Sequence, residues 1–126
     1  MIGTHSEVFH SDEVLASSML LYTKEFENAA IVRSRNEDLL NEMDIVCDVG
    51  AIYDHEKKRY DHHQRSFNTF WNDKTEEKGI KLSSAGLIYK HYGREVLANI
   101  LKEVWNTTYS QENFDKVYYK LYNSFF

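Results

Sequence analysis

Four of the six histidines lie in two short stretches of sequence that also contain aspartate. The first stretch carries His5, His10 and Asp12, and the second is the triplet Asp61-His62-His63. Between them, Asp48 falls in the apolar run 45–49, where a carboxylate needs a partner. Mixed imidazole and carboxylate ligands suit Mn²⁺, Fe²⁺, Co²⁺ or Zn²⁺. A carboxylate can bridge two such cations, and two cations about 3.5–4 Å apart can hold the attacking and leaving oxygens of a phosphoryl transfer.

Each of these residues also has an ordinary structural explanation when it is taken alone. Asp12 suits the positive end of a helix, His5 could be a hydrogen-bonded strand-end histidine, and the triplet could be a polar turn. Their joint occurrence favours a shared metal site over these separate explanations. The remaining histidines, His55 and His91, stand apart from both stretches, and we assign neither to the site.

The order of the predicted elements indicates how the site residues could meet. Strands are predicted at residues 1–5, 30–33 and 45–49, with a hairpin at 52–53 and 59–60. Helices are predicted from Ser11 to about Phe26, over 36–43, from Ser83 or Ser84 to about Ile100, and over 114–125; the first has the apolar residues Val14, Leu15, Met19, Leu21, Tyr22 and Phe26. This order predicts an α/β fold, a mainly parallel sheet flanked by helices. Ligands of such sheets bind beyond the carboxyl ends of the strands, where His5, Asp48 and Asp61 are expected.

Residues 61–82 show no clear periodicity and form a long predicted loop. In it, Phe67, Phe70 and Trp71 lie among Arg65, Lys74, Lys78 and Lys81, a mixture that could bind single-stranded nucleic acid through stacking and charge. The alternative is that the aromatic residues anchor the loop to the core. Lys81, Ser83 and Ser84 open the following helix and could receive a phosphate there, or the serines could serve only as a helix cap.

Composition and charge define the class of protein. The 126 residues fit one domain with one core, and no apolar run approaches the roughly 18 residues that cross a membrane, so we expect no membrane partner. The single cysteine, Cys47, excludes an internal disulfide and a cysteine-based zinc site, which makes an intracellular setting the default expectation. The net charge of −5 argues against generic nucleic-acid binding.

The distribution of charge changes that conclusion. Residues 1–56 hold 3 basic and 12 acidic side chains, whereas residues 57–81 hold 7 basic and 4 acidic ones. An acidic half beside a basic segment is what a cation site next to a phosphate site would produce. A chance distribution of surface charge is the alternative.

Four ordered motifs resemble a known family. The triplet Asp61-His62-His63 is similar to the signature of the DHH phosphoesterase superfamily. Together with Gly3-Thr4-His5…Phe9-His10-Ser11-Asp12-Glu13, the run from Asp44 to Gly50 and Lys81-Leu82-Ser83-Ser84-Ala85-Gly86-Leu87, it resembles the melanocyte-proliferating-gene family within that superfamily. The resemblance runs from the first residues to about residue 96.

The resemblance implies a dinuclear site, with two Mn²⁺ as the expected ions and Mg²⁺, Co²⁺ or Zn²⁺ as alternatives. It implies a 3′-to-5′ exonuclease that acts on RNA, in mitochondria, the nucleus or both. His5 and His10 would hold one metal, Asp12 and His62 the other, and Asp48 would bridge them. His63 would contact the substrate phosphate, and Asp61 would orient the histidines. Arg65, Lys81, Ser83 and Ser84 are the expected phosphate contacts.

The resemblance also implies that residues 1–126 are the N-terminal catalytic domain of a longer protein. The last metal-ligand aspartate of the superfamily and its substrate-binding C-terminal domain would then lie beyond residue 126, and this chain alone would be inactive. Two other functions stay open from the sequence: hydrolysis of a small phosphate compound such as pyrophosphate or a dinucleotide, and a non-catalytic metal-binding interaction module. The sequence gives no indication of the oligomeric state.

Overall fold

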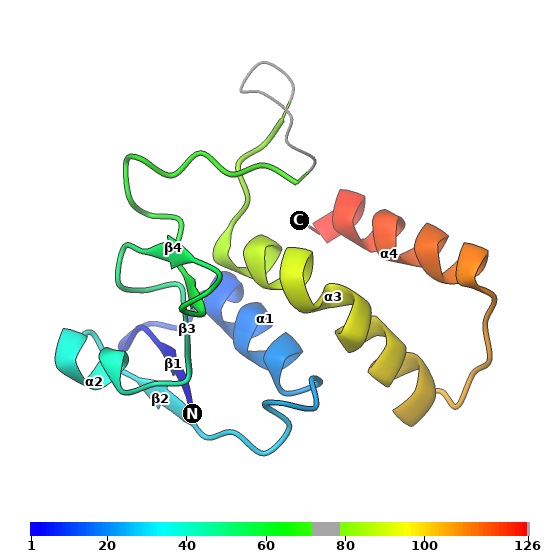
Figure 1. Cartoon of the computed structure of the whole chain (residues 1–126), viewed down its shortest axis with the longest axis horizontal. Helices are drawn as coiled ribbons and strands as arrows, with labels where there is room; N and C mark the ends of the chain where they lie inside the picture. The colour runs from blue at the N-terminus through cyan, green and yellow to red at the C-terminus, as the bar shows by residue number, and fades with distance from the viewer. Residues whose placement is uncertain (72–78, 126) are drawn as a thin grey trace.

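A five-stranded sheet forms the centre of the computed structural model, which describes residues 1–71 and 79–125 (Figure 1). Its strands are β1 (Ile2–Thr4), β2 (Ile31–Arg33), β3 (Ile45–Cys47), β4 (Tyr53–Asp54) and β5 (Arg59–Tyr60), in the order β2-β1-β3-β5-β4. Strand β1 is parallel to β2 and β3, β3 is parallel to β5, and only β4 is antiparallel to its neighbour. The predicted mainly parallel α/β fold is confirmed.

Helices cover both faces of this sheet (Figure 1). Helices α1 (Ser11–Leu20) and α3 (Ser84–Glu103) pack together over one face, α2 (Glu37–Asn41) lies on the other, and α4 (Gln111–Phe125) packs against α3. The main core between the sheet and α1 and α3 includes Ile2, Leu20, Ile45, Tyr60 and Leu87, all fully buried. None of the helices within residues 1–71 and 79–125 is long and apolar enough to span a membrane.

The strand order creates a switch point beside β1. From β1 the chain passes through α1 to β2 on one side of the sheet, whereas β3 on the other side leads towards β5. Ile2 is level with both Ile31 and Ile45, and Cys47 is level with Tyr60, so the parallel strands end at a common edge. A crevice opens outside the carboxyl ends at such a switch point, which is where open α/β sheets bind their ligands.

The first helix differs from its prediction. It ends at Leu20 instead of near Phe26, because the chain turns there and the Thr23 hydroxyl donates a hydrogen bond to the Leu20 carbonyl. Val14 and Leu15, two of the apolar residues of the predicted helix, are 44% and 39% exposed. Polar side chains occupy part of the inner face of this helix, so apolar residues alone do not mark it; its buried residues include Glu13, Ala16, Ser17 and Leu20.

The aromatic residues of the 61–82 loop are packed inward. Phe67 and Phe70 are buried, and Trp71 stacks on Tyr122 of α4 with 3.9 Å between the ring centroids. Their rings are therefore engaged with the core, which supports the anchoring alternative over base stacking. Lys74 and Lys78, two of the four basic residues of the proposed nucleic-acid segment, lie outside the described residues.

The two histidines outside the metal motifs join α3 to the β4–β5 hairpin. His91 and His55 stack with 3.8 Å between their ring centroids, and His91 Nε2 lies 2.9 Å from the Tyr53 hydroxyl. His55 Nδ1 lies 2.6 Å from the hydroxyl of Tyr60. Burial, reinforced by the neighbouring His55 and Lys90, lowers the pKa of His91 to about 4. Both histidines therefore have structural roles here.

The lowered pKa of His91 predicts that the protein loses stability in mild acid. An unfolded chain takes up a proton on histidine near pH 6.5, whereas folded His91 resists protonation until about pH 4. The free energy of unfolding should therefore fall as the pH drops through this window, and His91→Gln should remove roughly 1 to 3 kcal/mol of that fall. Urea unfolding of both proteins between pH 4 and 7 measures it; a wild-type-to-variant difference that stays constant with pH would contradict the prediction.

Candidate metal and phosphoester site

A cavity of about 480 Å³ lies at the carboxyl ends of the strands. It is lined by His5, His10, Arg35, Glu37, Leu40, Asp48, Val49, Gly50, Ala51, Asp61 and His63. The lining residues come after β1, β2, β3 and β5, four strands whose carboxyl ends lie at the same edge of the sheet. Five residues selected from the sequence therefore line a single cavity. His62 lies 3.6 Å from the lining residue Asp48, and Asp12 lies 3.6 Å from His62.

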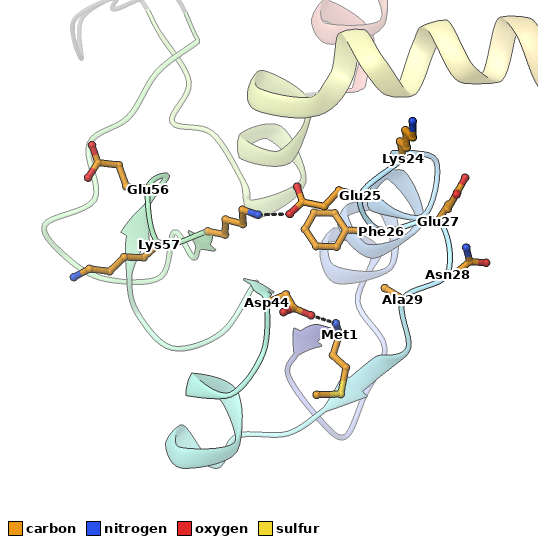
Figure 2. A pocket seen from close by; sticks show the side chains of 11 residues that line it. Met1, Lys24, Glu25, Phe26, Glu27, Asn28, Ala29, Asp44, Glu56 and Lys57 are labelled. Atoms are coloured by element: carbon orange, nitrogen blue, oxygen red, sulfur yellow. Dashed lines mark hydrogen bonds and ion pairs between the residues drawn. The ribbon is translucent and has the colours of Figure 1, made fainter.

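A second hollow, of about 600 Å³, lies at the opposite, amino ends of the strands (Figure 2). Met1 precedes β1, Asp44 precedes β3, and Lys58 precedes β5. Two ion pairs lie at this hollow: the Met1 amino group pairs with Asp44, and Lys58 pairs with Glu25 (Figure 2). None of the predicted site residues lines this hollow.

His5 is buried, and one of its ring nitrogens has no hydrogen bond to any residue that the structure describes. Its Nδ1 lies 3.0 Å from the Ser6 carbonyl, which can only accept, so Nδ1 carries the proton of a neutral ring. Its Nε2 makes no hydrogen bond and lies 3.4 Å from a Glu13 oxygen and 3.6 Å from Asp48 Oδ2. A nitrogen lone pair that faces two carboxylates is unfavourable alone, and a cation between the three groups would satisfy all of them.

Asp48 lies at the centre of the site. Its Oδ2 faces His5, and its Oδ1 lies 3.6 Å from His62 Nδ1 and accepts a hydrogen bond from the Ser84 hydroxyl at 3.1 Å. Burial, followed by the nearby Asp12 carboxylate, raises the pKa of Asp48. Its backbone is left-handed, with φ of 60°, an uncommon conformation that clusters at functional sites. Asp48 is thus the one carboxylate that reaches both His5 and His62 in the part of the chain that the structure describes.

The N-terminus of helix α3 contacts Asp12, another metal-ligand candidate. The Ser84 and Ala85 N–H groups donate to the two oxygens of Asp12 at 3.1 and 2.6 Å, and Asp12 Oδ2 lies 3.6 Å from His62 Nδ1. The positive end of the helix therefore stabilises the carboxylate. His62 Nδ1 also lies 2.9 Å from the Ser84 hydroxyl.

Ser83 and Ser84, which were expected to contact phosphate, already form hydrogen bonds within the protein. Ser84 is fully buried, and its hydroxyl already contacts Asp48 and His62. The Ser83 hydroxyl accepts a hydrogen bond from Gly86 N–H, so it caps the helix. The Ser84 hydroxyl is therefore engaged with Asp48 and His62, whereas the Ser83 hydroxyl accepts at the cap and can still donate its own proton. The phosphate contact expected of Ser83 and Ser84 stays a prediction.

Asp61 organises the triplet. One of its oxygens accepts from the Ala51 N–H at 2.7 Å, and the other lies 2.6 Å from His63 Nδ1 and accepts from the His62 N–H at 2.8 Å. Burial alone would raise the pKa of Asp61, but these hydrogen bonds, led by His63, lower it. The same contact is the main reason that the pKa of His63 is raised. Asp61 therefore fixes a His63 side chain that is 61% exposed beside the cavity.

Two groups of side chains have ligand atoms close enough to share a metal ion. One consists of His5, His10 and Glu13, and the other of Asp48, Asp61, His62 and His63. Glu13, which is fully buried on α1, was not predicted from the sequence to belong to the site. Its position three residues after His10, a capping-box spacing, is the feature of the sequence that could have indicated it. Arg35 was not predicted either. It is an exposed residue that lines the cavity and has no charged partner within residues 1–71 and 79–125.

The two other expected phosphate contacts lie away from these groups. Arg65 and Lys81 are exposed, and neither lines the cavity. Their phosphate-binding role stays a prediction.

The fold and this histidine–carboxylate cluster define an α/β protein with a candidate divalent-metal site at the switch point of its sheet. The model of an uncharacterised protein family (UPF0160), labelled MYG1 exonuclease, matches residues 1–126. The chain belongs to this family.

Curated relatives agree with that assignment. The chain is 46% identical over 128 residues to a MYG1 protein of Caenorhabditis elegans, covering 99% of this chain and 36% of the relative. It is 44% identical over 126 residues to the MYG1 exonucleases of Mus musculus and Homo sapiens, covering 98% of this chain and 32% of each relative. The chain thus spans about a third of the length of these relatives. No solved structure gave a significant match.

The position of Ser84 predicts that it supports metal binding. Ser84→Ala removes the hydroxyl between Asp48 and His62, and we expect Mn²⁺ affinity to fall roughly 10-fold or more, since hydrogen-bond partners of metal ligands contribute on that scale. Calorimetric titration and the Mn²⁺-dependent rise in unfolding temperature measure the change. The neighbouring Ser83→Ala should instead lower the free energy of unfolding by about 1 kcal/mol and retain the affinity. Equal affinities for Ser84→Ala and Ser83→Ala would contradict this role.

Proposed function

We propose that this chain forms the catalytic part of a metal-dependent phosphodiester hydrolase, a 3′-to-5′ exonuclease that acts on RNA. The observation that carries the proposal is the position of Asp48, 3.6 Å from His5 Nε2 and 3.6 Å from His62 Nδ1. It joins the two groups of ligand atoms into one site. The relatives named MYG1 exonuclease support the nuclease class, and the motif resemblance supports the RNA substrate, the direction and the membership of the DHH superfamily.

The residues present fit two divalent cations. His5 and His10 would hold one, Asp12 and His62 the other, and Asp48 would be shared. The unpaired Nε2 of His5 and the three carboxylates Asp12, Glu13 and Asp48 are a donor set that favours positive charge. When bound, such ions supply charge that neutralises phosphate oxygens and lower the pKa of a water molecule.

The chain's own residues supply the remaining parts of the reaction. Asp61 holds His63 through Nδ1, which leaves the other ring nitrogen of this exposed side chain for a phosphate oxygen. From there it can donate a hydrogen bond to charge that develops in the transition state. Arg35, on the cavity wall, is placed to bind a phosphate group through its guanidinium fork. The mitochondrial or nuclear setting stays a prediction from the family resemblance.

Asp48→Asn tests the shared-carboxylate role. The amide keeps the shape of the side chain but loses the charge that would bind two cations, so we expect Mn²⁺-dependent RNA hydrolysis to fall roughly 100-fold or more. The assay uses the natural protein that carries this chain and a single-stranded RNA labelled at either end. Progressive shortening of the 5′-labelled strand, with immediate release of a 3′-terminal label, is the expected wild-type result.

Several outcomes separate this proposal from its alternatives. Cleavage of a circular RNA of the same sequence would show an endonuclease, and preferential release of phosphate from pyrophosphate would favour a small-molecule substrate. Binding of Mn²⁺ without hydrolysis of any of these compounds would favour the interaction module. Circular dichroism and thermal unfolding must show that Asp48→Asn retains the fold.

Arg35→Gln tests the phosphate contact that the cavity indicates. Loss of a charge-assisted hydrogen bond should raise KM for RNA roughly 10-fold or more, with a smaller change in kcat. Arg65→Gln, measured beside it, tests the contact expected from the sequence, and the better phosphate ligand shows the larger rise in KM. Arg94→Gln is the control, because Arg94 pairs with Asp115 on the surface of α3 and α4. An unchanged KM for Arg35→Gln would overturn its assignment.

A further inference from the structure

Glu13 connects three segments around the His5 half of the site. It lies in the first turn of α1 and is fully buried. One carboxylate oxygen accepts a hydrogen bond from the His10 N–H at 2.7 Å and lies 3.4 Å from His5 Nε2. The other accepts from the Arg33 guanidinium at 3.1 Å. A single carboxylate thus contacts the end of β1, the start of α1 and the end of β2.

Arg33 extends this contact along the whole loop between His5 and His10. Besides Glu13, its guanidinium lies within hydrogen-bond reach of the carbonyls of Glu7 and Val8, at 3.4 and 3.5 Å. Its central carbon lies 3.9 Å from the centroid of the Phe9 ring, a cation–π distance. Arg33 therefore touches three consecutive residues of the loop that separates the two histidines.

The loop itself needs such support. Glu7 has φ of 78°, a left-handed conformation that a residue with a Cβ rarely adopts without surrounding structure to hold it. Val8 and Phe9 are both 69% exposed, so little apolar burial fixes the loop. The contacts to Arg33 and Glu13 are the ones that can hold His10 at a set distance from His5.

We propose that the Glu13–Arg33 ion pair is a positioning device that sets the geometry, and hence the metal affinity, of the His5–His10 half of the site. The inference rests on the metal binding of the proposed function. Glu13 supports the two histidines through hydrogen bonding and charge, while Arg33 neutralises the buried carboxylate and fixes the loop. The Asp12–His62 half lacks these contacts and is held by Ser84 and the N-terminus of α3.

This arrangement makes the two halves separable in a binding experiment. Mn²⁺ binding to the natural protein that carries this chain is measured by calorimetry, with electron paramagnetic resonance to detect coupling between two ions. In Arg33→Gln we expect one of two Mn²⁺ affinities to fall roughly 10- to 100-fold, with the other unchanged and with loss of the coupled signal at limiting metal. Arg33→Lys keeps the charge but not the fork, so its affinity should lie between those of the wild type and Arg33→Gln.

Arg94→Gln is the matched control, since it removes an arginine from an ion pair far from the cavity, and it should bind both ions as the wild type does. If Arg33→Gln does not fold, the Mn²⁺ affinities of Arg33→Lys test the positioning role instead. Wild-type affinities in the folded Arg33 variants, or an equal weakening of both sites, would overturn the positioning role.

Glu13→Gln distinguishes positioning from direct ligation. If Glu13 is a positioning residue, Glu13→Gln should weaken the same one of the two Mn²⁺ affinities that Arg33→Gln weakens. Complete loss of one ion in Glu13→Gln, combined with unchanged affinities in Arg33→Gln, would make Glu13 a ligand and overturn the proposal. A wild-type protein that binds no divalent ion would instead reject the proposed function itself.

Discussion

The close approach of carboxylates at the carboxyl ends of the strands is the constraint on which the site depends. Asp48, buried after β3, lies near Asp12, and that proximity together with burial raises its pKa. Histidine nitrogens surround the pair, with one left unpaired at His5. Such a concentration of negative charge in a poorly solvated crevice is unfavourable without a counter-charge. A divalent cation would add positive charge to what the Ser84 hydroxyl and the N–H groups of α3 already donate to these carboxylates.

Helix α3 is as important to the site as the sheet. It follows a long loop, yet its first turn inserts the Ser84 hydroxyl between Asp48 and His62 and directs two N–H groups at Asp12. In the described part of the loop before it, Phe67 and Phe70 are buried and Trp71 stacks on Tyr122 of α4. The N-terminus of the helix contacts both Asp12 and His62, which lie 3.6 Å apart.

Strand-end positions could be predicted from the sequence, whereas contacts between distant side chains could not. His5, Asp48 and Asp61 lie at the ends of short predicted strands, and the parallel order of those strands brings them to one edge. Ser84 and Arg35 carried no such signal, because their roles depend on the approach of segments that are far apart in the chain. Glu13 looked like an ordinary helix-start acid, and only the position of β2 beside β1 shows that Arg33 reaches it.

The two halves of the site have separate mechanical supports and one shared ligand. Arg33 and Glu13 belong to β2 and α1, Ser84 belongs to α3, and none of them contacts the other half directly in the described structure. Changes in residues without shared partners add independently, whereas residues that meet at one group do not. Disturbing Arg33 or Glu13 should therefore leave the Asp12–His62 half intact, whereas the loss of Asp48, or of the Ser84 hydroxyl that donates to Asp48, affects both halves. Cooperation between two cations here would thus pass through one carboxylate.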